Sequence, residues 1–499
     1  MRGRVLAPAL LCLALGCAAS LPEATTTPPV DLAAPSVASL SGEAQGEARE
    51  ATPPALPTGP LTLERAVEIA LERNHGLVMA RQEREIADGQ VIEARSAALP
   101  TIGLRGSYMR MDRVTTFPAS PSYDLPVFDA GGLPTGDYIT MPATPAFQLS
   151  AYDNYAAVLT LQQPVYLGGR ALAARRIATT RRAAVEDQVA AAEQGMVLGV
   201  YKGFYDVLLA GEDVKAAEEA LDFSRKHAED VARRLQQGMA TRFELTRAEV
   251  RREMSETGAI VARNAKAQAR ASLFTLLGMS PDVDVEIVGA LEFEPVNEPG
   301  PEAARTALAK RPDLAAHDKF LAIQRESITI ARADGLPTVL VTGEAGWEDP
   351  SQMSFGDLKD DTYWRAGLVL NMTLFDGLRI KGRLRQERAR LAQLATGRAQ
   401  LVDRIKLEVE QARLALANAR KAVASQAKAL EQAREARALA QAAYDQGVGT
   451  QLDVLGAQLG VTEARRGHAR SVYGYVMASV ALQQAMGTLR PAAREGNVR

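Results

Sequence analysis

The second half of this 499-residue chain repeats the first half at a constant offset. Five positions recur 209 residues later: Gly168, Arg170, Gly238, Thr241 and Gly278 return as Gly377, Arg379, Gly447, Thr450 and Gly487. A further pair, Ala-Leu-Pro-Thr at 98–101 and Gly-Leu-Pro-Thr at 335–338, is 237 residues apart, so the first copy carries one insertion, placed around 109–154. A repeat this long is a duplicated structural half rather than a solenoid unit of roughly 20–50 residues. Each half should therefore contain the same elements.

Residues 1–17 are predicted to be an export signal peptide. Arg2 and Arg4 precede an apolar run that is too short to span a bilayer. The run ends in Leu-Ala-Leu-Gly-Cys, which resembles a bacterial lipobox with Ala14 and Leu15 in the reverse of the usual order. Cys17 is therefore the expected lipid attachment site, with an ordinary cleaved signal as the alternative.

The composition of the remaining chain limits its class. Residues 18–60 are rich in Ala, Pro, Ser and Thr and are expected to form a disordered tether, and 490–499 form a short polar tail. The net charge of −2 argues against a nucleic-acid partner. No later segment has 18 consecutive apolar residues, so no helical membrane span is expected.

Two windows without proline, 165–280 and 351–490, are predicted to be helical. Ala, Leu, Arg, Gln and Glu dominate both, and all are strong helix formers. Apolar residues in the second window follow the 4-3-4-3-4 spacing of a coiled-coil seam. They are Ile405, Val409, Ala412, Leu416, Ala419 and Val423. A helix over 169–237 would be about 104 Å long, which makes sense only if such rods pack against one another.

Each long helix is interrupted once, by the related sequences Arg-Leu-Gln-Gln-Gly-Met-Ala-Thr and Ala-Tyr-Asp-Gln-Gly-Val-Gly-Thr. Gly238 and Gly447 supply the left-handed residue that ends a helix. A threonine then caps the returning helix, with an acidic residue three positions later. These pairs are Thr241 with Glu244 and Thr450 with Asp453. Each half is thus predicted to contain one helical hairpin.

Four short segments alternate between apolar and polar residues, which is the pattern of a strand with one apolar face. They cover 102–108, 155–166, 339–345 and 364–374. Residues 108–166 and 347–375 hold 14 of the 25 aromatic residues, and clustering at strand ends is typical of a membrane-interface girdle. The apolar face is expected to meet outer-membrane lipid. The opposite face, with Arg105, Glu344 and Arg365, is expected to line a barrel lumen.

Four strands cannot close a barrel, and an open sheet edge in lipid leaves backbone groups unsatisfied. The chain is therefore expected to oligomerise and to pool strands from several copies. This argument alone does not fix the number of copies.

The duplicated plan of strands and long hairpins, with an export signal, resembles the TolC-like outer-membrane efflux family over 61–489. The most specific motifs are the two hairpin tips, Arg-Leu-Gln-Gln-Gly-Met-Ala-Thr-Arg-Phe-Glu-Leu-Thr-Arg-Ala-Glu at 234–249 and Tyr-Asp-Gln-Gly-Val-Gly-Thr-Gln-Leu-Asp-Val-Leu-Gly-Ala-Gln at 444–458. Tyr-Leu-Gly-Gly-Arg at 166–170 and Phe-Asp-Gly-Leu-Arg at 375–379 match the family's junctions between strand and helix.

The resemblance implies an α+β membrane protein that forms a homotrimer. Its twelve-stranded β-barrel, with four strands per chain, is continued by a long α-helical coiled-coil barrel in the periplasm. The first repeat would cover 61–290 and the second 291–489. The implied function is the outer-membrane channel of a tripartite efflux or type I secretion system, which docks a periplasmic adaptor and an inner-membrane pump and catalyses no reaction.

The family's gate residues carry over only in part. Tyr444 matches the tyrosine that ties the second hairpin to an acidic residue on the first, at Glu244. Asp453 matches one aspartate of the ring that narrows the aperture, and is expected to concentrate cations there. The second ring aspartate and an arginine tie would fall at Gly456 and Gly449, so both are missing. We expect the closed state to be held differently or less tightly.

The tips around Gly238, Thr241, Gly447 and Thr450 are expected to dock the adaptor. Two gate residues have simpler alternative roles: Tyr444 as an ordinary packing residue between helices, and Asp453 as a helix-start residue, which is compatible with a gate.

An enzyme and a structural coiled-coil protein are the two alternative classes. An enzyme is not expected, because the four histidines match no metal-ligand spacing and no nucleophile has a paired base, so neither a metal nor another cofactor is implied. A lipid-anchored coiled-coil stalk of the envelope would explain the long helices and Cys17. It would not explain the alternating strands or the clustered aromatic residues.

Overall fold

The computed structural model describes residues 59–114, 116–148, 151–296, 300, 302–349 and 361–489. These residues belong to one compact unit, Gly59–Arg499. The expected signal peptide, Cys17, nearly all of the tether and the tail lie outside the described residues.

The two halves contain helices of equal length at the predicted offsets. Both long helices, α3 (Arg170–Gln236) and α7 (Arg379–Asp445), have 67 residues, and the returning helices α4 (Arg242–Leu276) and α8 (Gln451–Ala485) have 35 each. Shorter helices precede the strands: α1 (Leu63–Arg73) and α2 (His75–Ser96) in the first half, α5 (Ala303–Lys310) and α6 (Pro312–Ala333) in the second. None of the described helices combines the length and apolar character that a membrane crossing requires.

The four predicted strands form one antiparallel sheet with the order β1-β6-β7-β8. Their bounds are Thr101–Arg110 for β1, Asp153–Leu167 for β6, Thr338–Asp349 for β7 and Asp361–Asn371 for β8. Met372 and Leu374, which the alternation placed on the apolar face of the last strand, lie beyond the end of β8. β1 and β8 are the edges of the sheet, so each pairs on one side only.

The strand register is the same in both halves. Leu104 lies opposite Leu159 in the β1–β6 pair, and their counterparts Val341 and Leu368 lie opposite each other in the β7–β8 pair. Since a slip of one residue turns every side chain to the other face of a sheet, this register keeps the apolar side chains together. Leu104 and Leu368 are 78% and 68% exposed, so this apolar face is open in the single chain.

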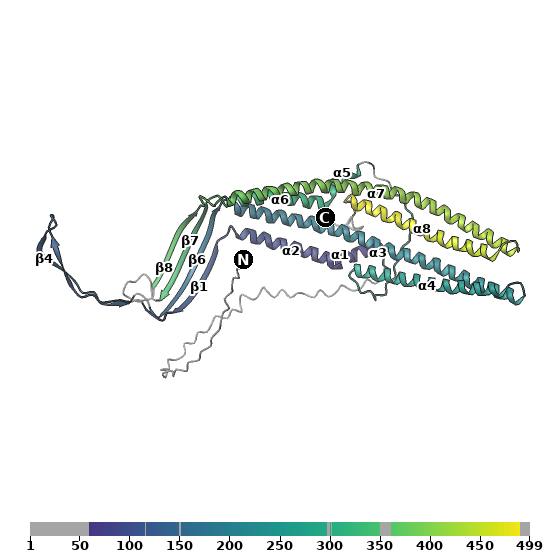
Figure 1. The fold of residues 1–499 in the computed structure, drawn as a ribbon, viewed down its shortest axis with the longest axis horizontal. Helices are drawn as coiled ribbons and strands as arrows, with labels where there is room; N and C mark the ends of the chain where they lie inside the picture. Colours follow the sequence, from purple (N-terminus) through teal and green to yellow (C-terminus); the bar gives the residue numbers. More distant parts are fainter. Residues whose placement is uncertain are drawn as a thin grey trace, which may run out of the picture. The chain divides into compact units, whose positions relative to one another are not determined.

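The insertion forms strands that the alternation did not predict. β2 (Thr116–Phe117) pairs with β5 (Phe147–Gln148), and β3 (Tyr123–Phe128) pairs with β4 (Pro134–Met141). Figure 1 shows this ribbon beyond the end of the four-stranded sheet that lies away from the helices. Tyr123, Phe128 and Tyr138 lie on the ribbon and are exposed. These three aromatic residues therefore lie outside the four-stranded sheet, and the interfacial girdle stays a prediction.

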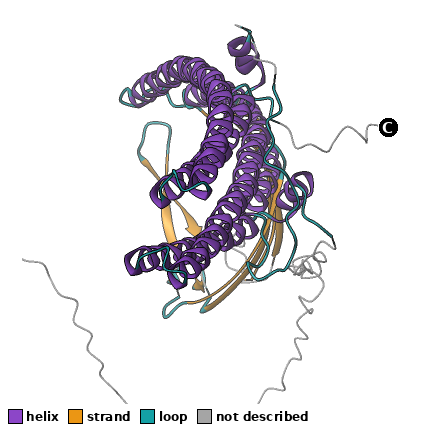
Figure 2. Cartoon of the chain, turned by 90° about the vertical axis from the view of Figure 1, so that its right-hand side faces the viewer, coloured by secondary structure: helices purple, strands orange, loops and turns teal. Residues whose placement is uncertain are grey.

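Four helices lie side by side in the order α2, α3, α6, α7, and Figure 2 shows this layer end-on as an arc. α4 packs on α3, and α8 packs on both α7 and α3. The predicted coiled-coil seam is confirmed, since Ile405, Val409, Leu416 and Val423 are all buried. Leu416 and Val423 share a buried cluster with residues of α8, and Ile405 and Val409 share one with residues of α5 and α6.

A buried carboxylate joins the two halves where the strands lead into the long helices. Asp334, at the end of α6, has a side chain only 6% exposed and pairs with Arg170 at the start of α3. It also lies 2.6 Å from Arg383 and 3.8 Å from Arg379 at the start of α7. The equivalent residue of the first half, 237 positions earlier, is Ala97. This junction therefore occurs once in each chain.

We expect Asp334→Asn to lower the free energy of unfolding by about 1–2 kcal/mol, because it removes the charge that three guanidinium groups share. The midpoint of thermal unfolding, followed by circular dichroism in detergent, should fall. Asp318→Asn is the matched control, since the Asp318 pair with Arg398 is nearly half exposed. Equal shifts in the two variants would contradict the junction role.

Candidate gate and docking tips

Both hairpin tips have the same backbone turn. Gly238 and Gly447 adopt the left-handed conformation, with φ of 73° and 78°. In the first tip, the Met239 N–H donates to the Arg234 carbonyl at 2.8 Å and the Gly238 N–H donates to the Leu235 carbonyl at 3.0 Å. These two bonds form the Schellman motif, which requires a residue that tolerates positive φ. The expected helix-ending role of both glycines is confirmed.

Both returning helices begin with a complete capping box. The Thr241 N–H donates to the Glu244 carboxylate at 2.7 Å, and the Thr450 N–H donates to the Asp453 carboxylate at 2.9 Å. Hydrogen bonds from the Thr241 backbone and hydroxyl lower the pKa of Glu244, and those from the Thr450 hydroxyl and backbone lower the pKa of Asp453. Both carboxylates are therefore ionised at neutral pH. The predicted helix starts are confirmed.

Each tip exposes two apolar side chains at equivalent positions. Met239 and Phe243 are 68% and 74% exposed, and their counterparts Val448 and Leu452 are 80% and 56% exposed. The sequence interpretation missed these residues. A signal was available, because both tips have an apolar residue directly after the turn glycine and another two residues after the capping threonine.

Tyr444 contacts the first hairpin through a residue other than the expected one. In the described part of the chain no hydrogen bond links Tyr444 to Glu244, whose carboxylate is bound to Thr241. The guanidinium of Arg234 instead lies over the Tyr444 ring, 4.5 Å from its centre, which is a cation–π contact. Burial raises the pKa of Tyr444, against the effect of Arg234, so the phenol stays neutral.

A buried histidine makes a second contact between the hairpins. Nε2 of His227, on α3, lies 2.7 Å from Nε2 of Gln451, the first residue of α8. The His227 ring stacks on Phe223 and lies 6.4 Å from the Tyr444 ring. An amide N–H can donate only to a ring nitrogen that carries no proton. Burial lowers the pKa of His227, Asp230 raises it and Arg234 lowers it, so the neutral imidazole is favoured.

Further contacts between α3 and α8 join the hairpins along their length. In each of them α3 supplies an acidic side chain and α8 supplies an arginine or a tyrosine. They are Asp206 with Tyr473 at 2.6 Å, Asp213 with Arg466 at 3.5 Å, Glu212 with Arg465 at 3.8 Å, and Glu219 with Arg465. Opposite charges thus hold the two hairpins of one chain together.

The structure brings two of the three expected lumen residues together. Glu344 and Arg365 lie opposite each other on β7 and β8, with an ion pair at 3.0 Å. The Tyr363 hydroxyl donates to the same carboxylate at 3.0 Å. Arg105 lies on the same face of the sheet but on the edge strand β1, where its cross-strand neighbour is Val158.

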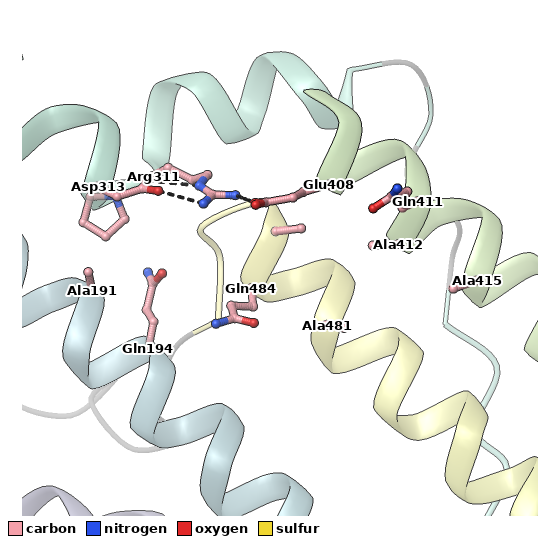
Figure 3. A pocket seen from close by; sticks show the side chains of 12 residues that line it. Ala191, Gln194, Arg311, Asp313, Glu408, Gln411, Ala412, Ala415, Ala481 and Gln484 are labelled. Carbon is pink, nitrogen blue, oxygen red and sulfur yellow. Dashed lines mark hydrogen bonds and ion pairs between the residues drawn. The ribbon is translucent and has the colours of Figure 1, made fainter. Parts of the chain in front are cut away.

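A cavity of about 610 Å³ lies between α3, the start of α6, α7 and α8. Figure 3 shows Arg311 between Asp313 and Glu408, with the amides of Gln194 and Gln484 facing the same space. Arg311 pairs with both carboxylates. The three charged side chains that line this cavity are therefore engaged with one another, and they join α6 to α7.

Comparison with known proteins places the chain in a family. A model described as outer membrane efflux protein matches residues 66–279 and 303–488, one stretch in each half. The cobalt-zinc-cadmium resistance protein CzcC of Cupriavidus metallidurans is 23% identical over 284 residues, which cover 57% of this chain and 58% of CzcC. The alkaline protease secretion protein AprF of Pseudomonas aeruginosa is 24% identical over 229 residues, 45% of this chain and 47% of AprF. The chain thus spans about half the length of the curated relatives it matches.

The fold is also that of a solved structure. The Campylobacter jejuni CmeC outer membrane channel superposes with a TM-score of 0.71 at 18% identity, with 87% of each chain covered. The expected fold of one chain, with four strands, two long hairpins and an internal duplication, is therefore confirmed. Because the family model covers most of both halves, the chain belongs to the outer membrane efflux protein family.

Proposed function

We propose that the protein is the outer-membrane channel of a tripartite efflux or type I secretion system, a passive conduit that catalyses no reaction. The observation that supports this most directly is the four-stranded sheet with an exposed apolar face and two unpaired edges. Lipid suits such a face, and only closure satisfies such edges. Three copies supply the twelve strands that the family's barrel requires.

The relatives support the same role. CzcC is named for resistance to cobalt, zinc and cadmium, and AprF for secretion of an alkaline protease. A conduit serves cargoes this different when its partners select them. We therefore assign the choice of cargo to an inner-membrane pump and a periplasmic adaptor, and the passage alone to this protein.

The hairpin tips form the gate in this proposal. Arg234 over Tyr444, and Gln451 on His227, hold the second hairpin to the first and close the channel. Glu244 orients the first tip through its capping box, and Asp453 supplies an ionised carboxylate near the axis. These contacts replace the tie between Tyr444 and Glu244. They also compensate for the family's arginine and aspartate, whose positions are occupied here by Gly449 and Gly456.

The same tips dock the adaptor in this proposal. Gly238 and Gly447 form the turns, and Thr241 and Thr450 cap the helices that follow. Together they present the exposed side chains of Met239, Phe243, Val448 and Leu452, which no other described part of the chain covers. The recurrence of two exposed apolar side chains at equivalent positions of both tips supports an interaction surface there.

A lipid-anchored stalk remains the alternative function. It accounts for the helical hairpins but gives no role to the apolar sheet face.

The first experiment measures conductance in planar lipid bilayers. Purified wild-type protein should conduct weakly, and Arg234→Ala combined with Gln451→Ala should raise the conductance several-fold, because the two contacts between the hairpins near their tips are removed. Arg233→Ala is the control, since this neighbouring arginine is 71% exposed and pairs within its own helix. High conductance in every variant would reject the latch and keep the channel. No conductance from a confirmed oligomer would favour the stalk.

The closed state should weaken at acidic pH. Histidine has an ordinary pKa of about 6.5, and burial lowers that of His227 in the closed state. The closed state therefore binds fewer protons than an open state in which His227 is solvated. Closure is fully stabilised above pH ~6.5 and weakens as the pH falls toward the lowered pKa. Conductance should rise on acidification, and His227→Gln should flatten this dependence. An unchanged pH profile in His227→Gln would reject the assignment.

Met239→Asp combined with Val448→Asp should abolish adaptor binding, because a charge replaces the apolar side chain at each tip. Adaptor that is cross-linked to the channel in the native cell measures the effect, and the yield of trimer checks folding. Val250→Asp, at an apolar residue of α4 that is 54% exposed and away from the turn, is the control. Retained adaptor in the double variant would show that docking occurs elsewhere.

A further inference from the structure

We propose that neighbouring copies join through an interface, called the seam, that repeats the contact between the two halves of one chain. The charges of the seam between copies are opposite in sign to those of the seam inside the chain. In this seam Glu256 on α4 of one copy pairs with Lys421 and Lys428 on α7 of the next. The edge strand β8 of one copy pairs with β1 of the other, with Leu368 opposite Tyr108. The inference rests on the proposed trimeric channel and specifies how its copies recognise one another.

The duplication allows the seam to be derived. In a closed ring the two halves alternate, so each contact between the first and second half inside a chain recurs between the second half of one copy and the first half of the next. The offsets of 209 and 237 residues transfer one seam onto the other. Their accuracy is tested inside the chain, because they carry the β1–β6 register onto the β7–β8 register without a slip.

The same transfer predicts the register between β8 of one copy and β1 of the next. Inside the chain, Leu159 of β6 lies opposite Ala345 of β7. The residue 209 positions after Leu159 is Leu368 on β8, and the residue 237 positions before Ala345 is Tyr108 on β1. The next pair, Thr160 with Glu344, becomes Val369 with Ser107.

The predicted register agrees with the two faces of the sheet. Leu368 and Tyr108 both lie on the apolar face and are 68% and 56% exposed in the single chain. Val369 and Ser107 both lie on the polar face. A register shifted by one residue would place apolar against polar along the whole seam.

The ion pairs transfer in the same way. Inside the chain, Glu212 and Glu219 on α3 contact Arg465 on α8. The residues 209 positions after the two glutamates are Lys421 and Lys428 on α7, and the residue 209 positions before Arg465 is Glu256 on α4. Each of these three residues carries a charge opposite in sign to that of its counterpart 209 positions away. Opposite charges therefore meet again, now between copies.

The three residues are placed to meet a neighbouring copy. Lys421 and Lys428 are exposed, each stands two residues before a buried residue of α7, and neither has an ion pair in the described part of the chain. Two residues correspond to about 200° around a helix, so both lysines lie on the side away from the core. Within the described residues Glu256 forms one ion pair, with Arg225 at 3.6 Å, and both side chains are about half exposed. Such a pair contributes little and leaves the carboxylate available.

Cysteine cross-linking tests the strand register in the full-length protein. We expect Val369→Cys with Ser107→Cys to give covalent dimers and trimers on mild oxidation, visible on non-reducing gels and lost on reduction. Thr160→Cys with Glu344→Cys is the matched control, because it is the equivalent pair inside one chain and should form its disulfide without linking copies. Val369→Cys with Arg105→Cys, shifted by two residues on the same face, should not link copies.

The outcomes separate this inference from the proposed function. The seam would be overturned, and the channel left intact, by either of two outcomes in a protein that still runs as a trimer and conducts. One is cross-linking of copies by the shifted pair, and the other is no cross-linking by either pair. A monomeric, non-conducting protein would overturn both. Variants with only one introduced cysteine measure how much cross-linking arises from Cys17.

Charge exchange tests the helical part of the seam. Glu256→Lys should lose the trimer under detergent and temperature conditions in which the wild type keeps it. Adding Lys421→Glu and Lys428→Glu to the same chain should restore the trimer. Arg465→Glu, which acts inside the chain, should not be rescued by the same two lysine changes. A stable trimer in Glu256→Lys, or failed rescue, would overturn the ion pairs.

Discussion

The fold depends on one constraint: a backbone hydrogen-bonding group exposed to lipid must find a partner. One chain contributes only four strands, and β1 and β8 each leave one edge unpaired. Within a bilayer the sheet is stable only after these edges meet those of other copies. In the proposed channel the long helices are subject to the same closure, since each follows a strand of the sheet along the chain. Asp334 holds the starts of both long helices at the point where sheet becomes helix.

The local structure could be read from the sequence wherever a strong periodic signal coincided with the duplication. Helix α3 begins and ends within one residue of the predicted range 169–237, and Gly238 and Thr241 occupy the turn and cap positions assigned to them. The position of the insertion was predicted but its strands were not, because they have no counterpart in the second half and alternate too briefly to stand out. The sheet also ends earlier than the alternation suggested, since Met372 and Leu374 continue an apolar pattern without a partner strand.

The contacts between the hairpins were harder to predict than the hairpins themselves. Glu244 is placed as the resemblance implied, but its carboxylate is bound by the helix start that it caps. Tyr444 contacts Arg234 instead, in the last turn of α3. His227 carries no motif and lies in a run of ordinary helix-forming residues, so only its burial next to Gln451 identifies it. Sequence patterns report spacing along one helix, whereas these contacts depend on which helices lie next to one another.

The acidic face of α3 and the basic face of α8 also have a consequence for how such a chain evolved. A duplicated gene first encodes two identical halves, and identical halves assemble in any order. Once one half carries Glu212 and Glu219 where the other carries Lys421 and Lys428, two first halves placed side by side would set glutamates against Glu256. Like charges oppose such arrangements while opposite charges favour alternation. In the proposed trimer, divergence at a few surface positions is thus enough to give six related units a fixed order.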